Sequence, residues 1–256
     1  MAVKLVELLE DEERADAQSV SILLQRDPAL AAAVIKVANC AAFGGLSQIT
    51  NLAQAVSRLG LTQVRSVVTA ISMKKMFTSD DKTEREILKS LWAHSMATAA
   101  AAKKIANMTG VDPEACFLAG LLHDVGQLLV QAGLHRLKLQ TPDLEVTDVV
   151  FKELLDSEHA ELGHDVLRQW NFPEPVATAV KNHHNVDAMN EGELTLCIQA
   201  ANLIASRVAQ CADAQPERDL MAFAPVVALD LTEVELATLI VDLEDDIAIL
   251  TSQFGS

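Results

Sequence analysis

His123 and Asp124 interrupt an otherwise apolar run of the sequence, "FLAGLLHDVGQLLV". Burying an imidazole and a carboxylate among leucines is costly unless another group pairs with them. A metal ion could be that group, because histidine and aspartate both ligate transition metals. A hydrogen bond inside a helical core would meet the same need, so the pair by itself leaves both interpretations open.

Other histidines lie along the same part of the chain, next to segments in which apolar residues have helical spacing. They are His94, His159, His164 and the adjacent pair His183 and His184, whereas His135 is typical of an exposed loop. Each of them, taken singly, fits an ordinary surface or core residue. Imidazoles and carboxylates from several helices that meet inside a bundle commonly hold metals. One metal lowers the pKa of bound water, and two can hold a phosphate ester for in-line attack.

The apolar residues recur every three or four positions through almost the whole chain, which predicts an all-α protein. The Asp27-Pro28 step separates two expected helices, and Gly60 separates two more. A long helix is expected over 87–108, and another begins at Asp112-Pro113 and carries both His123 and Asp124. Further helices are expected over 146–158, 159–169, 174–184, 193–210 and 232–252. Adjacent residues of one helix lie about 100° apart, so the His-Asp pair can flank a single ion.

Composition supports helices over sheets, since half of the 256 residues are hydrophobic and only 4% are aromatic. The four cysteines lie singly in apolar surroundings without the spacing of a zinc site or a disulfide framework. We interpret Cys40, Cys116, Cys197 and Cys211 as small core residues.

The formal net charge of −16 opposes nucleic-acid binding, which depends on neutralising phosphates with lysine and arginine. The longest uninterrupted apolar runs, such as "LATLIV", are far shorter than the roughly 20 residues of a membrane span. The N-terminal segment turns acidic too early for a signal peptide. We therefore expect a cytoplasmic protein without a membrane or nucleic-acid partner.

The order of these motifs resembles the HDOD family, the HD-related output domains of bacterial signalling proteins, within the HD superfamily of metal-dependent phosphohydrolases. Several stretches carry the resemblance, in consecutive order over roughly residues 18 to 210. They are "RDPALAAAVIKVANCAAFG", "ITNLAQAVSRLGLTQVRSVV", "LWAHSMATA", "AGLLHDVGQLLV" and "EHAELGHDVLRQWNFPEPVATAVKNHH".

The resemblance implies one HDOD domain over residues 1–256, built as a helical bundle. It would comprise an N-terminal helical lobe (1–84), an HD-like lobe (85–210) and a C-terminal helical extension (211–256). The resemblance also implies the candidate metal ligands: His94, His123, Asp124, His159, His183 and His184. The implied role is regulatory, as an output module that binds signalling partner proteins. An exposed apolar patch for such a partner is expected near residues 78–90.

Two departures from the HD pattern argue against hydrolysis. Active HD hydrolases add a further aspartate ligand, and the corresponding position here is Asn202. The HD-GYP phosphodiesterases have an acidic residue and a Gly-Tyr-Pro loop after the histidine pair, whereas this chain has Asn185 and no tyrosine. We expect iron, manganese or zinc to be weakly bound or absent. The alternatives are a phosphohydrolase acting on a nucleotide or cyclic dinucleotide, and a cyclic-dinucleotide binder without turnover.

Overall fold

The structure of the chain is a computed structural model that describes residues 16–39, 49–74, 79, 81–141, 146–170, 172–185, 192–208 and 219–254. Every regular element within these ranges is a helix, which confirms the predicted all-α class. Contacts divide the chain into two compact units, Met1–Met76 and Phe77–Ser256. The expected lobe limits at residues 84 and 210 stay predictions; residue 84 lies within a helix, and residue 210 lies outside the described ranges.

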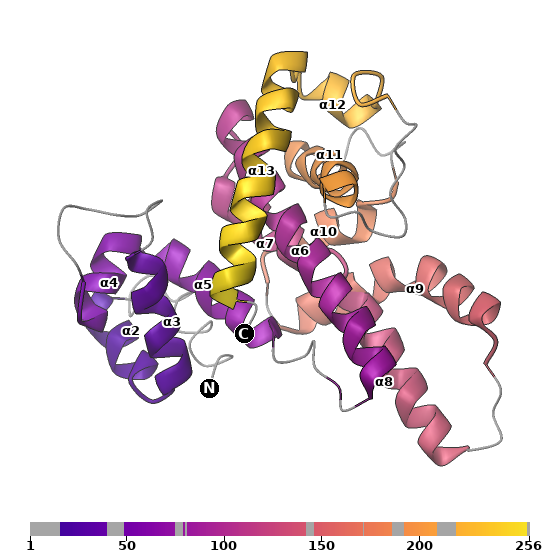
Figure 1. The fold of residues 1–256 in the computed structure, drawn as a ribbon, viewed down its shortest axis with the longest axis horizontal. Helices are drawn as coiled ribbons and strands as arrows, with labels where there is room; N and C mark the ends of the chain where they lie inside the picture. Colours follow the sequence, from indigo (N-terminus) through magenta and orange to yellow (C-terminus); the bar gives the residue numbers. More distant parts are fainter. Residues whose placement is uncertain are drawn as a thin grey trace. The chain divides into compact units, whose positions relative to one another are not determined.

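In the first unit the described residues form four helices, drawn in indigo and violet in Figure 1: α2 (Ala17–Leu24), α3 (Pro28–Ala38), α4 (Leu52–Leu59) and α5 (Leu61–Lys74). The helix boundary expected at Asp27-Pro28 is confirmed, and the Asp27 carboxylate accepts a hydrogen bond from the Leu30 N–H. Gly60 separates α4 from α5 with a φ of 77°, which an L side chain rarely adopts. The side-chain amide of Asn39 bonds both the N–H and the carbonyl of Ile49. These contacts connect the end of α3 to the segment that leads into α4.

Eight helices lie in the described part of the second unit: α6 (Lys82–Thr109), α7 (Pro113–Leu122), α8 (Val125–Gln140), α9 (Asp148–Gln169), α10 (Glu174–Asn182), α11 (Glu193–Val208), α12 (Ala224–Ala228) and α13 (Glu233–Phe254). Helix α6 packs against α7, α11 and α13, while α9 packs against α8 and α10. A run of fully buried alanines in α6 lets these neighbours approach closely. A capping box begins α13: Thr232 and Glu235 exchange hydrogen bonds through their side chains and N–H groups.

The helix that was expected to carry both His123 and Asp124 is in fact two helices. His123 is the C-cap of α7 and Asp124 the N-cap of α8, and the Asp124 side chain makes no capping hydrogen bond. Its carboxylate is therefore directed to other partners. The opposite difference occurs at 146–158 and 159–169, which form the single helix α9 with His159 in its interior.

One helical stretch, Pro113–Leu137, is long and apolar enough to cross a bilayer by length and composition. The sequence analysis overlooked it because charged or polar residues interrupt its apolar runs. Within its most apolar window, 72% of the residues are buried, as in the core helices of a bundle. The cytoplasmic location and the absence of a membrane partner stay predictions.

Two glycines permit the helix contacts that bring the His-Asp pair to its neighbours. A Cβ atom at Gly120 would lie 2.9 Å from the Cα of Ala99, where α7 crosses α6. A Cβ atom at Gly126 would lie only 1.8 Å from the carbonyl oxygen of His159, where α8 meets α9. Both glycines lie within three residues of the pair, so the absence of a side chain sets the spacing of the helices there.

We expect Gly126→Ala to lower the free energy of unfolding by about 1–3 kcal/mol, because α8 and α9 must separate to admit the methyl group. Gly133→Ala in the same helix is the matched control, since no atom lies within 4 Å of its added Cβ. Better helix propensity should make the control more stable by up to about 1 kcal/mol. Denaturant unfolding measures both, and equal stabilities for the two variants would contradict the close approach.

Candidate metal centre

The six predicted ligands come together in one place from four parts of the second unit. His94 lies on α6, and His123 and Asp124 lie at the junction of α7 and α8. His159 comes from α9, and the tandem pair His183 and His184 follows the last residue of α10. Residues 94 and 184 are thus brought to one centre by the packing of α6, α7, α9 and α10.

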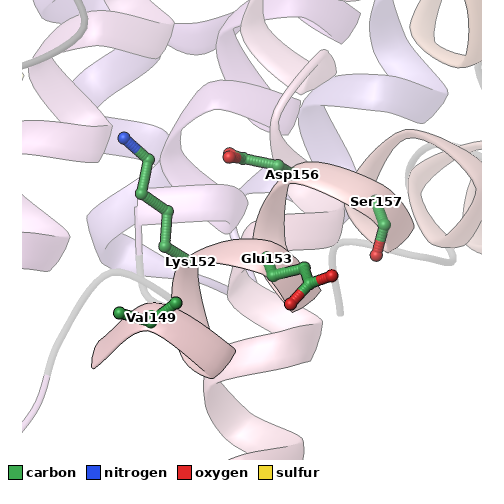
Figure 2. A pocket seen from close by; sticks show the side chains of 5 residues that line it. All are labelled: Val149, Lys152, Glu153, Asp156 and Ser157. Atoms are coloured by element: carbon green, nitrogen blue, oxygen red, sulfur yellow. The ribbon is translucent and has the colours of Figure 1, made fainter. Parts of the chain in front are cut away.

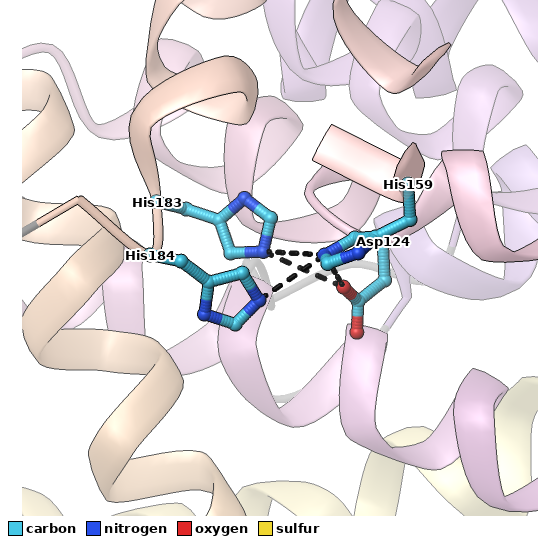
Figure 3. Close-up of side chains that lie close together, drawn as sticks. All are labelled: Asp124, His159, His183 and His184. Atoms are coloured by element: carbon cyan, nitrogen blue, oxygen red, sulfur yellow. Dashed lines mark hydrogen bonds and ion pairs between the residues drawn. The ribbon is translucent and has the colours of Figure 1, made fainter. Parts of the chain in front are cut away.

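The carboxylate of Asp124 lies at the middle of the cluster. Its Oδ2 atom is 3.1 Å from the Nε2 of His123 and 3.8 Å from that of His94. Its Oδ1 atom is 3.5 Å from the Nε2 of His183 and 3.6 Å from that of His159. Two groups of ligand atoms close enough to hold an ion therefore share Asp124: one with His94 and His123, the other with His159, His183 and His184. Figure 3 shows the second group, with the histidines surrounding the carboxylate.

Three of the imidazoles use Nδ1 for a backbone hydrogen bond and turn Nε2 toward Asp124. His123 donates to the carbonyl of Gly120 over 2.8 Å, and His183 donates to that of Val180 over 2.6 Å. His159 donates in the same way to the carbonyl of Leu155. With the proton held on Nδ1, each Nε2 presents a bare lone pair, which is the tautomer that metal-binding histidines adopt.

Several Nε2 atoms of the cluster lie within hydrogen-bond distance of one another. They lie 3.3 Å apart between His159 and His183, and 3.1 Å apart between His159 and His184. On the other side of Asp124, the Nε2 atoms of His94 and His123 are 3.2 Å apart. Facing lone pairs repel unless a proton or a metal ion lies between them. The donor set therefore fits a transition metal.

Burial favours the neutral form of three of the imidazoles, those of His94, His183 and His184. His123, His159 and His183 are at most 3% exposed, whereas His184 is exposed on one side. Burial, together with the neighbouring imidazole of His123, lowers the pKa of His94 to about 4. Burial and the adjacent imidazoles lower the pKa of His184 to about 3, and burial also lowers that of His183. Neutral imidazoles at physiological pH are ready to bind a metal without first losing a proton.

His123 and Asp124 shift each other's pKa in opposite directions. Burial alone would raise the pKa of the Asp124 carboxyl, but the charges and hydrogen bonds of His123 and His183 hold it well below its usual range. Burial alone would lower the pKa of His123, but Asp124 outweighs it and raises that pKa. The carboxylate is therefore ionised, and a metal ion can replace the proton of His123 as its counter-charge.

Helix α11 contributes two amides to the surroundings of the cluster. The side chain of Asn202, in the position where an HD hydrolase has aspartate, hydrogen-bonds to His94. Gln199, one turn earlier, bonds the turn that carries His183 and His184. The sequence analysis missed Gln199, and its signal was a lone glutamine within the apolar run "LCIQAANLI".

The two remaining histidines lie outside the cluster. His135, expected on a loop, is an exposed residue of α8 with its Nδ1 atom 4.0 Å from Glu84. His164 is buried on α9, where it lies near two carboxylates, those of Asp165 and Glu174. Glu161, His164 and Asp165 form a third group of ligand atoms. Lys181 already pairs with Glu161 over 2.9 Å, so this group is an ion-pair network on the surface.

The HDOD domain family matches residues 1–186, which include every helix from α2 to α10. The chain belongs to the HDOD family. An uncharacterised protein of Treponema pallidum (strain Nichols) is 28% identical over 192 residues, which cover 72% of this chain. Those residues span only 37% of that longer relative, so no activity of the whole relative is assigned to this HDOD chain.

Crystal structures of several bacterial proteins share the HDOD fold. One from Shewanella amazonensis, provisionally described as a metal-dependent phosphohydrolase, is 22% identical with a TM-score of 0.76, covering 99% of this chain and 90% of that one. An HDOD domain protein of unknown function from Geobacter sulfurreducens is 20% identical with a TM-score of 0.70 at the same coverage. A protein from Marinobacter aquaeolei, provisionally described as a signal transduction protein, is 20% identical with a TM-score of 0.73, covering 100% and 58%. At these identities the likeness establishes the fold.

In the metal-free chain, we expect the imidazole of His94 to titrate near pH 4, measured by the NMR shifts of its ring. An unfolded chain binds this proton near pH 6.5, so the folded state loses stability as the pH falls from 6.5 toward 4. The loss approaches about 1.4 kcal/mol per pH unit. His94→Gln removes this contribution, so the wild type should lose more stability than the variant over that range. Parallel stability curves for the two proteins would contradict the buried neutral imidazole.

Proposed function

We propose that this HDOD chain is a regulatory output domain of bacterial signalling that acts by binding a partner protein. Its cluster would hold at most one transition metal and would catalyse little or no phosphoester hydrolysis. The observation that carries the proposal is the charge of the cluster. Among the described residues, Asp124 is the single carboxylate in the two groups of ligand atoms that share it.

One carboxylate cannot neutralise two divalent ions in a buried site. A single ion beside Asp124 would have half of its charge compensated, whereas a second ion would share the same negative charge and repel the first. Repulsion between buried charges is weakly screened, and a two-metal hydrolase depends on both ions to hold the attacking and leaving oxygens. The neutral amide of Asn202 supplies no further charge beside His94.

The two sides of Asp124 are unequal. One side offers three imidazoles and a carboxylate oxygen, which is a full tetrahedral set for zinc and an acceptable partial set for iron or manganese. The other side offers two imidazoles, a carboxylate oxygen and the amide of Asn202. We place the single ion on the side of His159, His183 and His184. When bound, it would supply a Lewis acid and a bound water of lowered pKa.

We expect the chain, purified without chelator, to contain one transition metal or less per molecule by elemental analysis. Asn202→Asp should tighten binding of a second ion, since it restores a negative charge next to His94. Asn202→Leu is the matched control, because it removes the amide without adding charge and should not tighten binding. Two metals per wild-type chain would contradict the charge argument.

The alternative function is a metal-dependent phosphohydrolase acting on a nucleotide or cyclic dinucleotide, and the near-complete set of histidines favours it. Turnover of cyclic dinucleotides and of a generic phosphodiester, with added manganese or iron, separates the two functions. We expect negligible turnover by the wild type. Robust turnover that disappears in both His123→Ala and Asp124→Ala would replace the regulatory proposal by the enzyme.

We propose that the partner binds an exposed apolar surface on α9. The expected patch near residues 78–90 contributes exposed Ile87, but residues 75–78 and 80 lie outside the described ranges. On α9, Val149 is 75% exposed, and Val150, Leu154 and Leu162 are exposed as well. Of these, Val149 shares a helix face with Lys152, Glu153 and Asp156, whereas Leu154 and Leu162 lie farther around the helix, so we assign the binding surface to the Val149 face.

A shallow pocket of about 710 Å³ lies on this part of α9, lined by Val149, Lys152, Glu153, Asp156 and Ser157. In Figure 2, the side chains of Lys152 and Asp156 extend from α9 toward the same side. The lining combines an apolar side chain with two carboxylates and one ammonium group. It suits a partner segment that presents an apolar side chain next to a basic one.

A photo-crosslinking amino acid at position 149, in the full chain expressed in its own bacterium, should capture a defined partner protein. The same amino acid at position 241 is the control, because Val241 is also a largely exposed valine, on α13. Val149→Lys should abolish binding of the captured partner in purified form, since it places a charge in the apolar contact. Equal products from positions 149 and 241 would refute this surface.

A further inference from the structure

The turn that carries the tandem histidines is hydrogen-bonded to α11 through the side chain of Gln199. Gln199 is 2% exposed, and its Nε2 donates to the carbonyl of Asn182 over 2.9 Å and to that of Asn185 over 2.8 Å. These two carbonyls flank His183 and His184. The N–H of Asn185 also bonds the carbonyl of Asn182 over 3.0 Å and closes the turn on itself.

The direction of the Gln199 amide is fixed by these contacts. Only the NH2 end of the amide can face two carbonyl oxygens, so the Oε1 end points away from the turn. That oxygen is buried and, among the described residues, has no hydrogen-bond partner. An unpartnered buried acceptor is a cost to the folded state. A glutamine at this position thus carries a cost to the free energy of folding. Its NH2 group, however, donates both hydrogen bonds to the histidine turn.

We propose that Gln199 is a positioning residue for the metal centre: its amide holds the turn from Asn182 to Asn185 so that His183 and His184 keep their Nε2 atoms beside Asp124 and His159. The inference rests on the proposed metal site on that side of Asp124. The need for such a clamp is geometric. Metal–ligand distances tolerate deviations of only about 0.2 Å, whereas residues beyond the last turn of a helix fray readily.

Helix α11 is well placed for this task. It packs against α6, α7 and α10, which carry His94, His123 and the tandem pair. Gln199 and Asn202 are three residues apart and share one face of the helix. Gln199 serves the turn of His183 and His184, while Asn202 bonds His94. One buried helix face therefore supports both sides of the cluster.

The test compares Gln199→Met, which keeps the length of the side chain without its donors, with the wild-type full chain. Gln131→Met is the matched control, since Gln131 is also buried and lies two helical turns from Asp124 on α8. Zinc affinity is measured by calorimetry, and the coordination geometry by the visible spectrum of bound cobalt(II). Gln199→Met should weaken zinc binding about 10–100-fold and alter the cobalt spectrum. Gln131→Met should change neither.

A second readout needs no metal. Hydrogen exchange of the Asn185 amide, which closes the turn, should be faster in metal-free Gln199→Met and unchanged in Gln131→Met. Gln199→Asn, whose amide falls one methylene short of the two carbonyls, should reproduce both effects in a chain that keeps its polarity.

The outcomes separate this inference from the metal proposal. If the wild type binds no zinc, the metal proposal fails, and the exchange of Asn185 alone decides the role of Gln199. Wild-type zinc affinity and cobalt spectrum in Gln199→Met, or unchanged exchange in the metal-free variant, would overturn the positioning role. Loss of folding in both Gln199 variants, with Gln131→Met intact, would also overturn it, because the glutamine would then be a general structural residue.

Discussion

The cluster is organised by one buried carboxylate, that of Asp124, with the Nε2 atoms of four imidazoles within 4 Å of it. Asp124 has its two oxygens toward different histidine groups, and the Nε2 atoms within those groups lie 3.1–3.3 Å apart. A carboxylate can be buried at this depth only if positive charge meets it. In the metal-free chain Asp124 raises the pKa of His123 against the effect of burial and so favours the protonated imidazole. Protons and metal ions therefore compete for the same lone pairs.

In that arrangement the helices pack so closely that a residue larger than glycine would clash at two of the contacts. Helix α7 meets α6 at Gly120, and α8 meets α9 at Gly126. His123 and Asp124 lie between these two glycines in the sequence. The break between α7 and α8 frees the Asp124 carboxylate from capping its own helix. The two glycines, the helix break and the inward-facing carboxylate therefore depend on one another. The glycines allow the close helix approach, and the break directs the Asp124 carboxylate to the histidines.

In the proposed function, this HD-type fold retains its histidines without supporting two-metal chemistry. Imidazoles bring ligand atoms but no negative charge, so the electrostatics of the centre depend on the number of carboxylates. The amide of Asn202, a hydrogen-bond partner of His94, adds no negative charge to that of Asp124. A binding function on the surface of α9 would not depend on that charge.

The sequence by itself determined the all-α class, the starts of α3, α7 and α13, and the set of six residues that converge. Those features are local: apolar spacing, caps and prolines act within one or two helical turns, and the histidine order repeats the HDOD pattern. Tertiary structure alone decided the break at His123 and Asp124, the single helix through His159, and the role of Gln199. Helix continuity at these points is set by contacts between residues far apart in the chain, such as Gly126 with the carbonyl of His159. No local pattern reports such contacts, because the groups that make them become neighbours only when the helices pack.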